Sequence, residues 1–354
     1  MTLSDTPPVF DGHNDLLLRL SQYPPDEAVR LFMTGRGEGH LDLPRMQTGG
    51  FFGGLFAVFV PSPAADRRGF HRIDGGYDVP VPAPMSQERA LAPALAMISL
   101  LHRIERTHPE SLRVCRSTAD IHSARNDRAI AAVLHLEGAE PIDADLRALD
   151  GLYAAGLRSI GPVWSRPTVF GHGVPFKFPS SPDTGPGLTA AGRSLVAACN
   201  DYGIVLDLAH LNERGFWDVA QMSRAPLVAS HSNAHALCPH ARNLTDEQLR
   251  AVADSGGIVG LNFGTYFLRP DGALDTATPV EVMLDHIDHM IDVMGEAHVG
   301  LGSDFDGIHR APIADAAELP CLIEAMQARG YSQTRIQRLA GENWLRVLES
   351  TWGE

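Results

Sequence analysis

Hydrophobic residues along the chain gather in short, nearly continuous runs that alternate with longer stretches in which apolar positions recur at a helical period. The apolar runs predict eight strands that are buried on both faces, at residues 9–13, 51–60, 130–136, 158–163, 204–208, 226–230, 257–262 and 298–303. The helical pattern is clearest at residues 86–106, 188–200, 246–253 and 281–294. Thr245, followed three positions later by Gln248, predicts a capping box at the start of the third of these helices.

Strands that alternate with helices indicate a parallel sheet covered on both faces. Eight such strands in 354 residues predict a (β/α)₈ barrel of the TIM type, with residues 1–354 forming a single catalytic domain. A doubly wound open sheet is the alternative, but no Gly-x-Gly-x-x-Gly follows the first strand. Two long segments rich in proline and glycine, residues 61–84 and 167–187, are expected to be loops that wall the active site or an interface.

Composition narrows the class of protein. Hydrophobic residues at 44% and charged residues at 20% are typical of a globular chain, and no apolar run is long enough to span a membrane. A net charge of −14, from 43 acidic and 29 basic residues, argues against nucleic acid as a partner. The four cysteines are scattered without a Cys-x-x-Cys pair, and neither terminus carries a secretion or lipid-anchor signal, so we expect a cytoplasmic protein.

The candidate chemistry lies at the predicted strand ends. In a barrel these ends open onto one face, so residues that follow different strands converge in space. Three histidines and three carboxylates occupy such positions: His13, Asp15, Glu137, His210, His231 and Asp304. A single strand-end histidine or aspartate is more often a rim residue or a helix cap. Burying all of them together without a cation would be costly, however, so the set predicts a metal site.

Imidazole and carboxylate are both ligands of Zn²⁺. Because the set has more ligands than one zinc ion needs, we expect two ions bridged by a carboxylate, which would lower the pKa of a bound water and give a hydrolase its nucleophile. No Gly-x-Ser-x-Gly motif is present, and no cysteine has an obvious histidine partner, so covalent catalysis has little support. His135 is expected to line the barrel one layer below the mouth.

The motifs around these residues resemble those of the membrane dipeptidase (renal dipeptidase) family of binuclear zinc peptidases, peptidase family M19, which are amidohydrolase-type barrels. The resemblance covers nearly the whole chain and rests on Asp11–Asp15, Leu136–Gly138, Asp207–His210, Ser230–Ala234, Arg242–Leu244 and Gly302–Gly307. It implies that His13 and Asp15 bind one zinc ion and that His210 and His231 bind the other. Glu137 would bridge the two ions.

The resemblance also implies how substrate is held. Arg242 would bind the C-terminal carboxylate, for which a planar two-pronged guanidinium is suited. Asp304 would contact the substrate amine and carry protons to the leaving nitrogen. Better-known members have a carbonyl-polarising histidine where this chain has Trp164, which offers only an indole N–H. Either zinc then polarises the carbonyl, or a donor from the following loop, such as His172, takes over.

The resemblance therefore implies a zinc-dependent dipeptidase that accepts dipeptides, including L-Xaa-D-Xaa, because the chemistry acts on the carbonyl and the second side chain lies beyond it. One alternative is a hydrolase of another amide, lactam or ester at the same site. A catalytically silent metal-binding protein is a second alternative, against which the presence of Asp304 argues. The family resemblance suggests a homodimer, and no membrane or nucleic-acid partner is expected.

Overall fold

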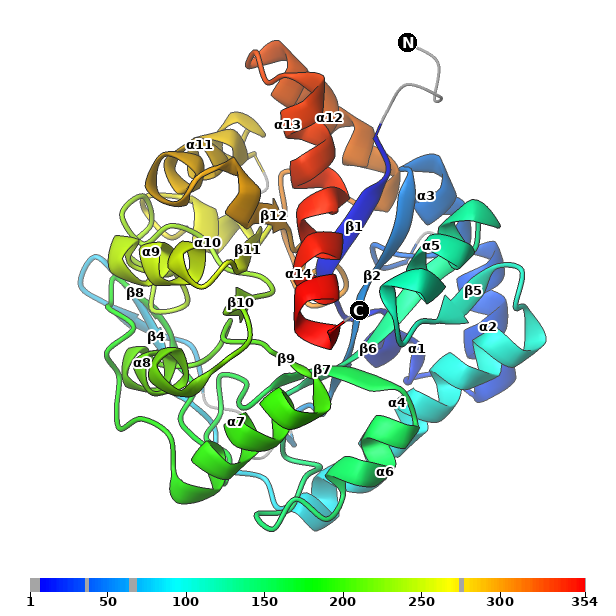
Figure 1. The fold of residues 1–354 in the computed structure, drawn as a ribbon. Coiled ribbons are helices and arrows are strands. Elements are labelled where there is room, and N and C mark those ends of the chain that lie inside the picture. The colour runs from blue at the N-terminus through cyan, green and yellow to red at the C-terminus, as the bar shows by residue number, and fades with distance from the viewer. Residues whose placement is uncertain (1–6, 36–37, 64–68, 274–276, 354) are drawn as a thin grey trace.

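Eight parallel strands form a barrel at the centre of the molecule, with helices packed around it (Figure 1). The computed structural model describes residues 7–35, 38–63, 69–273 and 277–353. In order around the barrel, the strands are β10 (Val228–Ala229), β11 (Ile258–Leu261), β12 (Val299–Leu301), β1 (Val9–Asn14), β2 (Phe51–Phe59), β6 (Ile130–Glu137), β7 (Leu157–Gly161) and β9 (Val205–Leu206). A bridge between Asp207 and Val228 completes the ring between β9 and β10. The predicted barrel and all eight predicted strands are confirmed.

The later strands are shorter than the sequence indicated. Residues 204–208 were expected to be extended, but β9 contains only Val205 and Leu206. Beyond them the Asp207 carboxylate accepts hydrogen bonds from the backbone N–H groups of Ser230, at 2.7 Å, and Ala209, at 3.1 Å. A side chain thus takes a donor that a longer ladder would have used, and the strand pairing ends there.

Helices follow most of the strands and shield their outer face. They are α1 (Leu16–Leu20), α2 (Pro25–Thr34), α3 (Leu43–Thr48), α4 (Gln87–Thr107), α5 (Thr118–Asn126), α6 (Leu149–Ala154), α7 (Ala190–Tyr202), α8 (Glu213–Met222), α9 (Asp246–Asp254), α10 (Thr265–Leu268), α11 (Glu281–Met294), α12 (Leu319–Ala328), α13 (Gln333–Gln337) and α14 (Asn343–Trp352). The four predicted helices correspond to α4, α7, α9 and α11. The capping box is present, since Gln248 N donates to Thr245 Oγ1 at 3.3 Å and Thr245 N to Gln248 Oε1 at 2.9 Å.

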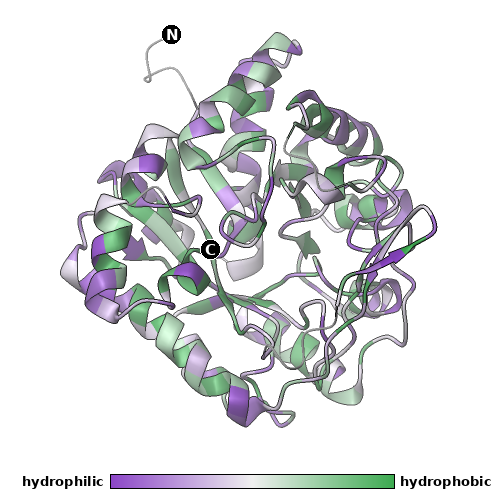
Figure 2. Cartoon of the chain, turned by 180° about the vertical axis from the view of Figure 1, so that it is seen from behind, coloured by the Kyte–Doolittle hydropathy of each residue, from purple (hydrophilic) through white to green (hydrophobic). Residues whose placement is uncertain are grey.

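Hydrophobic side chains fill the space between strands and helices, and Figure 2 shows the apolar colour on the strands and striped along the helices. At one end of the barrel α14 crosses the opening (Figure 1). There Trp344 is fully buried against Phe10, and its indole donates to Leu301 O at 2.9 Å. A Cβ at Gly12 would lie 2.2 Å from the Trp344 ring, so a glycine is required between Asp11 and His13.

The two segments expected to be loops contain short strands, so the prediction that they are irregular is wrong, whereas residues 167–187 do contribute to the pocket described below. Strands β3 (His71–Ile73), β4 (Gly76–Val79) and β8 (Phe176–Phe178) form a three-stranded antiparallel sheet, while β5 (Leu112–Val114) pairs with β6 outside the ring. β4 and β8 come from different loops, and an ion pair of 3.0 Å joins Asp78 to Lys177 across them. Such pairing has no local sequence signature. Residues 64–68 of the first loop, and residues 1–6, where a secretion signal was not expected, lie outside the described residues.

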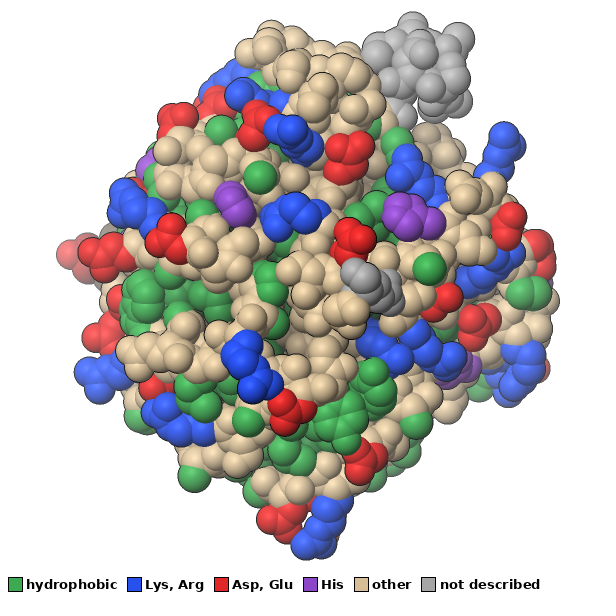
Figure 3. Space-filling model, in the orientation of Figure 1, with side chains coloured by type: hydrophobic (Ala, Val, Ile, Leu, Met, Phe, Trp, Pro, Cys, Tyr) green, Lys and Arg blue, Asp and Glu red, His purple; other side chains and the backbone are tan. Residues whose placement is uncertain are grey.

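On the face drawn in Figure 3, acidic and basic side chains lie interspersed. Charges of both signs are therefore mixed on this face. Among the ion pairs of the surface, Arg329 pairs with Asp285 and Asp288. Among the residues that the structure describes, no helix has both the length and the apolar run needed to cross a bilayer.

Candidate active site

Glu137 stands at the centre of the predicted ligand set. It is the last residue of β6 and is buried at the mouth of the barrel. Its Oε1 atom lies 3.0 Å from His210 Nε2, 3.6 Å from His231 Nε2 and 3.7 Å from His13 Nε2. One carboxylate oxygen thus faces three imidazole nitrogens that come from three other parts of the chain, and both ligand types are ones that zinc accepts.

His13 and Asp15 lie on one side of Glu137. The His13 Nε2 atom is 3.4 Å from Asp15 Oδ2, and the His13 ring lies over that of His231 with centroids 3.9 Å apart. Potential ligand atoms of His13, Glu137 and His231, and likewise of His13, Asp15 and Asp304, all lie within 4.8 Å of one another. The structure therefore brings the five predicted ligands and Asp304 together.

Hydrogen bonds behind the rings orient His210 and His231. Ser230 Oγ donates to Asp207 Oδ2 at 2.6 Å and lies 2.7 Å from His231 Nδ1, from which it can accept. Ser165 Oγ lies 2.9 Å from His210 Nδ1. A proton on each Nδ1 atom leaves both Nε2 lone pairs directed at Glu137, which is the arrangement that metal-binding histidines adopt.

Burial dominates the electrostatics of these groups. It lowers the pKa of His210 and of His231 well below the ordinary value and raises that of Glu137 well above it. Burial also lowers the pKa of His13, but the neighbouring Glu137 and Asp15 carboxylates outweigh this effect and raise it to about 10. His210 and His231 are therefore neutral imidazoles that can bind a divalent cation. A cation bound beside Glu137 and Asp15 would replace the proton of His13.

Unpartnered atoms show that the residues fit a metal. Both ring nitrogens of His13 and the Oδ1 atom of Asp15 are buried without a hydrogen-bond partner in the protein. A buried polar group without a partner is unfavourable, and a cation bound by one His13 nitrogen and by Asp15 would satisfy those atoms. His13, Asp15, Glu137, His210 and His231 could hold such an ion or ions.

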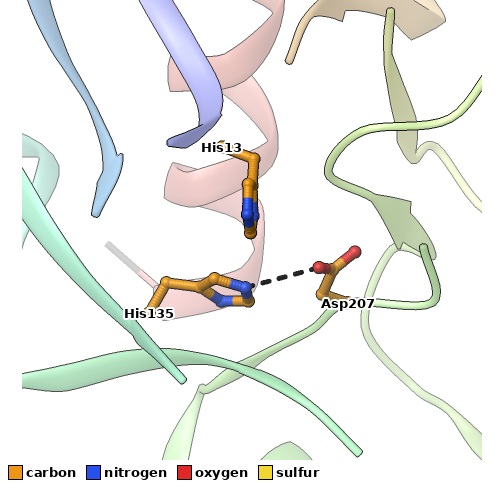
Figure 4. Close-up of side chains that lie close together, drawn as sticks. All are labelled: His13, His135 and Asp207. Carbon is orange, nitrogen blue, oxygen red and sulfur yellow. Dashed lines mark ion pairs between the residues drawn. The ribbon is translucent and has the colours of Figure 1, made fainter. Parts of the chain in front are cut away.

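A second layer lies below the metal-binding atoms. Figure 4 shows His135 and Asp207 beside His13, with the His135 Nε2 atom 3.4 Å from Asp207 Oδ2. His135 Nδ1 lies 2.9 Å from Ser159 Oγ, and the His13 and His135 rings meet edge to face with centroids 5.4 Å apart. His135 therefore lies within the barrel beneath the mouth, as expected from its position two residues before Glu137.

A pocket opens beside the ligand set. It is lined by Asp15, Leu18, Phe59, Glu137, Trp164, Phe176, His210, Arg242, Tyr266, Phe267, Asp304 and Gly307. Aromatic rings form one wall: Trp164 lies 4.9 Å from Phe59 and 5.5 Å from Phe176 between ring centroids. Three of the predicted ligands, Asp15, Glu137 and His210, thus share one small pocket with Asp304 and Arg242.

Arg242 is buried at this pocket. It donates from Nη2 to His231 O at 3.0 Å and from Nη1 to Ala209 O, while Nε has no hydrogen-bond partner. Burial lowers the pKa of its guanidinium. The side chain is therefore held in place by backbone carbonyls with a donor still unused.

Asp304 has a φ of +60°, a left-handed conformation for the first residue of the Asp-Phe-Asp-Gly motif. Its Oδ2 atom accepts from Asn262 Nδ2 at 2.8 Å. Burial raises its pKa to about 7.

Trp164 and His172 differ in their placement. Trp164 lines the pocket and lies 5.8 Å from the His210 ring between centroids. His172 is half-buried, its backbone carbonyl accepts from Asn212 N at 3.1 Å, and it is not part of the pocket lining described above. A role for His172 in binding substrate stays a prediction.

Several pocket residues were not anticipated. Phe59 ends β2, so its strand-end position was a signal that could have identified it. Tyr266 and Phe267 lie in α10, shortly after β11. Phe176 had no such signal, because its place in the wall depends on the pairing of β8 with β4.

Comparison with known proteins places this site in a family. The family model described as membrane dipeptidase (peptidase family M19) matches residues 1–352. The chain belongs to this family. A protein of Klebsiella pneumoniae named for its position in the pqqA 5′ region is 54% identical over 242 residues, which are 68% of this chain and 89% of that protein.

Two solved structures of the family are similar to this one. The dipeptidase AC, a metallopeptidase of family M19, is 52% identical with a TM-score of 0.93, covering 99% of this chain and 100% of that one. A metallopeptidase from Rhodobacter sphaeroides, liganded with a phosphinate mimic of the dipeptide L-Ala-D-Ala, is also 52% identical with a TM-score of 0.93, covering 98% of this chain and 100% of that one. The predictions of an M19 family member, a TIM-type barrel and a metallo-dipeptidase are confirmed, and the family implies a metal.

Proposed function

We propose that this M19 metallo-dipeptidase uses two Zn²⁺ ions and accepts dipeptides that include L-Xaa-D-Xaa. The observation that carries the proposal is the position of Glu137 Oε1 within 3.0 to 3.7 Å of the Nε2 atoms of three histidines. His13 and Asp15 would hold one ion, His210 and His231 the other, and Glu137 both. The Rhodobacter sphaeroides relative bound to an L-Ala-D-Ala mimic supports the substrate class.

Bound zinc supplies Lewis acidity and lowers the pKa of water. The chain supplies orientation and proton transfer. Ser230 and Ser165 fix the His231 and His210 rings through their Nδ1 atoms, so that only the Nε2 atoms face Glu137. The His13 ring is restricted by packing against the His231 ring, without such a hydrogen bond.

Arg242 and Asp304 would fix the two ends of a dipeptide. The unused Nε donor of Arg242 is suited to the C-terminal carboxylate, and burial strengthens such a charge-assisted hydrogen bond. Asp304 lines the same pocket and would accept a hydrogen bond from the free amine. It would also take a proton from the attacking water and pass it to the leaving nitrogen as the C–N bond breaks. Two charged ends held in one small pocket would exclude longer peptides.

Trp164 would form the apolar wall beside the peptide and would not polarise the scissile carbonyl. Its ring packs among Phe59, Phe176 and His210. Indole has one N–H donor and no acceptor, so it replaces neither the basicity nor the shape of an imidazole. Carbonyl polarisation would then fall to the metal.

A dipeptide panel tests the proposal. The purified protein is stripped of metal, reloaded with Zn²⁺ and assayed with matched L-Xaa-L-Xaa and L-Xaa-D-Xaa dipeptides, with metal content measured in parallel. We expect close to two zinc ions per chain and turnover of members of both series. Absence of turnover with every L-Xaa-D-Xaa dipeptide, or full activity with a single ion bound, would contradict it.

Three wider expectations also belong to this proposal. The chain forms one catalytic domain over residues 1–354, is cytoplasmic, and assembles as a homodimer. Sedimentation of the zinc-loaded protein tests the last of these, and a monomer at assay concentration would exclude it.

A further inference from the structure

Arg166 is a fully buried arginine next to the active site whose whole guanidinium is engaged. It donates from Nε to Glu140 Oε1 at 2.7 Å, from Nη1 to Ser62 Oγ at 2.7 Å and from Nη2 to Val60 O at 2.9 Å. The Nη2 atom is also 2.7 Å from Glu140 Oε1. The side chain thus joins segments that follow three neighbouring strands, β2, β6 and β7.

Each of these three strands places one residue in the pocket, and that residue lies shortly before the segment's contact with Arg166, or before Arg166 itself. Phe59 ends β2, Glu137 ends β6 and Trp164 follows β7, and all three line the pocket. Phe59 and Glu137 are register partners, as are Glu137 and Gly161. Arg166 therefore spans the section of the barrel rim that carries the central ligand and the aromatic wall.

The chain between Glu137 and Glu140 is shaped for this contact. Gly138 has a φ of +82°, which L-residues rarely adopt, and a Cβ there would lie 2.4 Å from Glu140 Oε2. The turn lets the Glu140 carboxylate lie against Gly138, the residue after Glu137, and accept from Arg166. Holding Glu140 is thus also a restraint on the direction of the Glu137 backbone.

Each of the three side chains in the segment Trp164–Arg166 makes a contact at or beside the site. Trp164 forms the wall of the pocket, Ser165 Oγ contacts His210 Nδ1 at 2.9 Å, and Arg166 anchors the segment to β2 and β6. The Arg166 guanidinium also lies 5.8 Å from the Trp164 ring centroid and 5.9 Å from that of Phe59. A shift of Arg166 would therefore move the wall and the hydroxyl that orients His210.

We propose that the Glu140–Arg166 pair positions the reaction's residues: it sets the Trp164 wall, the Ser165 contact to His210 and the direction of Glu137. This inference rests on the proposed function in that His210 and Glu137 hold the metal. A merely structural ion pair would support folding alone. A positioning pair changes metal affinity and the pocket while the fold persists.

The test uses Glu140→Gln combined with Arg166→Met, which removes both charges and keeps similar volumes, so that no single buried charge is left unpaired. Metal affinity is measured by chelator competition, and kcat and KM with a dipeptide. In the metal-free protein, acrylamide quenching of Trp164 fluorescence is obtained by difference from a Trp164→Phe version of each protein. We expect metal affinity 10- to 100-fold weaker, as with lost support for a metal ligand, together with a lower kcat and stronger Trp164 quenching.

Ser165→Ala isolates the link to His210 and alters only one hydroxyl, so it addresses the case in which the double variant does not fold. We expect its metal affinity to fall in the same direction with a normal melting temperature. Arg346→Met is the matched control, because Arg346 also ties strand-flanking carbonyls, donating to Gly256 O at 2.7 Å and Ala297 O at 2.8 Å, but before β11 and β12 at the other end of the barrel.

Wild-type metal affinity, kcat and Trp164 quenching in a folded double variant would overturn the proposal, and so would losses of the same size in the Arg346→Met control. If the double variant does not fold, unchanged metal affinity in Ser165→Ala overturns it. Failure of the proposed function would be seen separately, as absence of turnover in the zinc-loaded wild type. The positioning role would still be tested by Trp164 quenching in the metal-free protein.

Discussion

Replacing Arg242 by methionine is expected to weaken the use of dipeptides through loss of the hold on their C-terminal carboxylate. In the structure, two nitrogens of the guanidinium already donate to Ala209 O and His231 O, and Nε has no partner. The substrate can therefore gain at most the N–H groups that these carbonyls leave unused, two of them for a two-pronged contact. Hydrogen bonds to charged groups contribute about 1.5–3 kcal/mol each. Because part of the guanidinium is already engaged, we take the lower end, about 3 kcal/mol in total, which is about 10²-fold in kcat/KM.

The assay compares each dipeptide with its C-terminal amide, in the wild type and in Arg242→Met. The wild type should prefer the free acid by about 10²-fold, and the variant should lose most of that preference while its rate with the amide changes little. Arg242→Lys keeps the charge without the planar two-pronged geometry and should fall between the two. Melting temperature and metal content are followed as controls, because methionine leaves two buried carbonyls without donors. Equal losses with acid and amide would refute the reasoning and assign Arg242 a structural role.

Three further predictions concern the proton carrier, the support of a ligand and the barrel floor. Asp304→Asn removes the carboxylate that would carry the proton, so kcat should fall by about 10²- to 10⁴-fold with metal content unchanged; a normal kcat would exclude that role. Ser230→Ala leaves His231 Nδ1 without its partner, and chelator competition should show metal affinity about 10- to 100-fold weaker; unchanged affinity would mean that packing alone fixes the ring. Trp344→Ala opens a cavity under Phe10 and should lower the free energy of unfolding in urea by about 3–5 kcal/mol; a loss below about 1 kcal/mol would show that α14 is not part of the cooperative core.

The barrel was predictable because its strands are buried on both faces. All nine residues of β2 are buried, and a strand of this kind reads in the sequence as an unbroken apolar run. The grouping of His13, Glu137, His210 and His231 followed from the barrel as well, since strand ends converge however far apart they are in sequence. The alternation of apolar runs with helical patterns along the chain was sufficient to predict the barrel and the grouping of these residues.

Contacts between loops were not predictable in this way. The pairing of Tyr77 with Phe178 joins two segments that no local pattern relates, and it places Phe176 in the pocket. The sequence drew attention to Trp164 as a departure from the family pattern, but gave no sign of the contacts that Ser165 and Arg166 make beside it. Ser165 contacts His210, and Arg166 contacts Glu140, Ser62 and Val60, all of which are brought close only by the tertiary structure.

The strands are short at the mouth of the barrel, and the proposed ligands are fixed there. Both features follow from the same hydrogen bonds. Where three pairs of neighbouring strands end, a side chain accepts the backbone N–H that the ladder would otherwise use. Asp11 Oδ1 accepts from Ser303 N at 2.6 Å, Asp207 Oδ1 from Ser230 N at 2.7 Å, and Asn233 Oδ1 from Asn262 N at 3.0 Å.

Each of these acceptors lies within three residues of a proposed ligand: Asp11 is near His13, Asp207 near His210 and Asn233 near His231. A regular ladder is held by backbone hydrogen bonds alone, whereas here side chains take over some of these bonds next to His13, His210 and His231. The polar residues that surround the ligands in the motifs thus end the barrel in the geometry that the site requires, which is why the motifs extend beyond the ligands themselves.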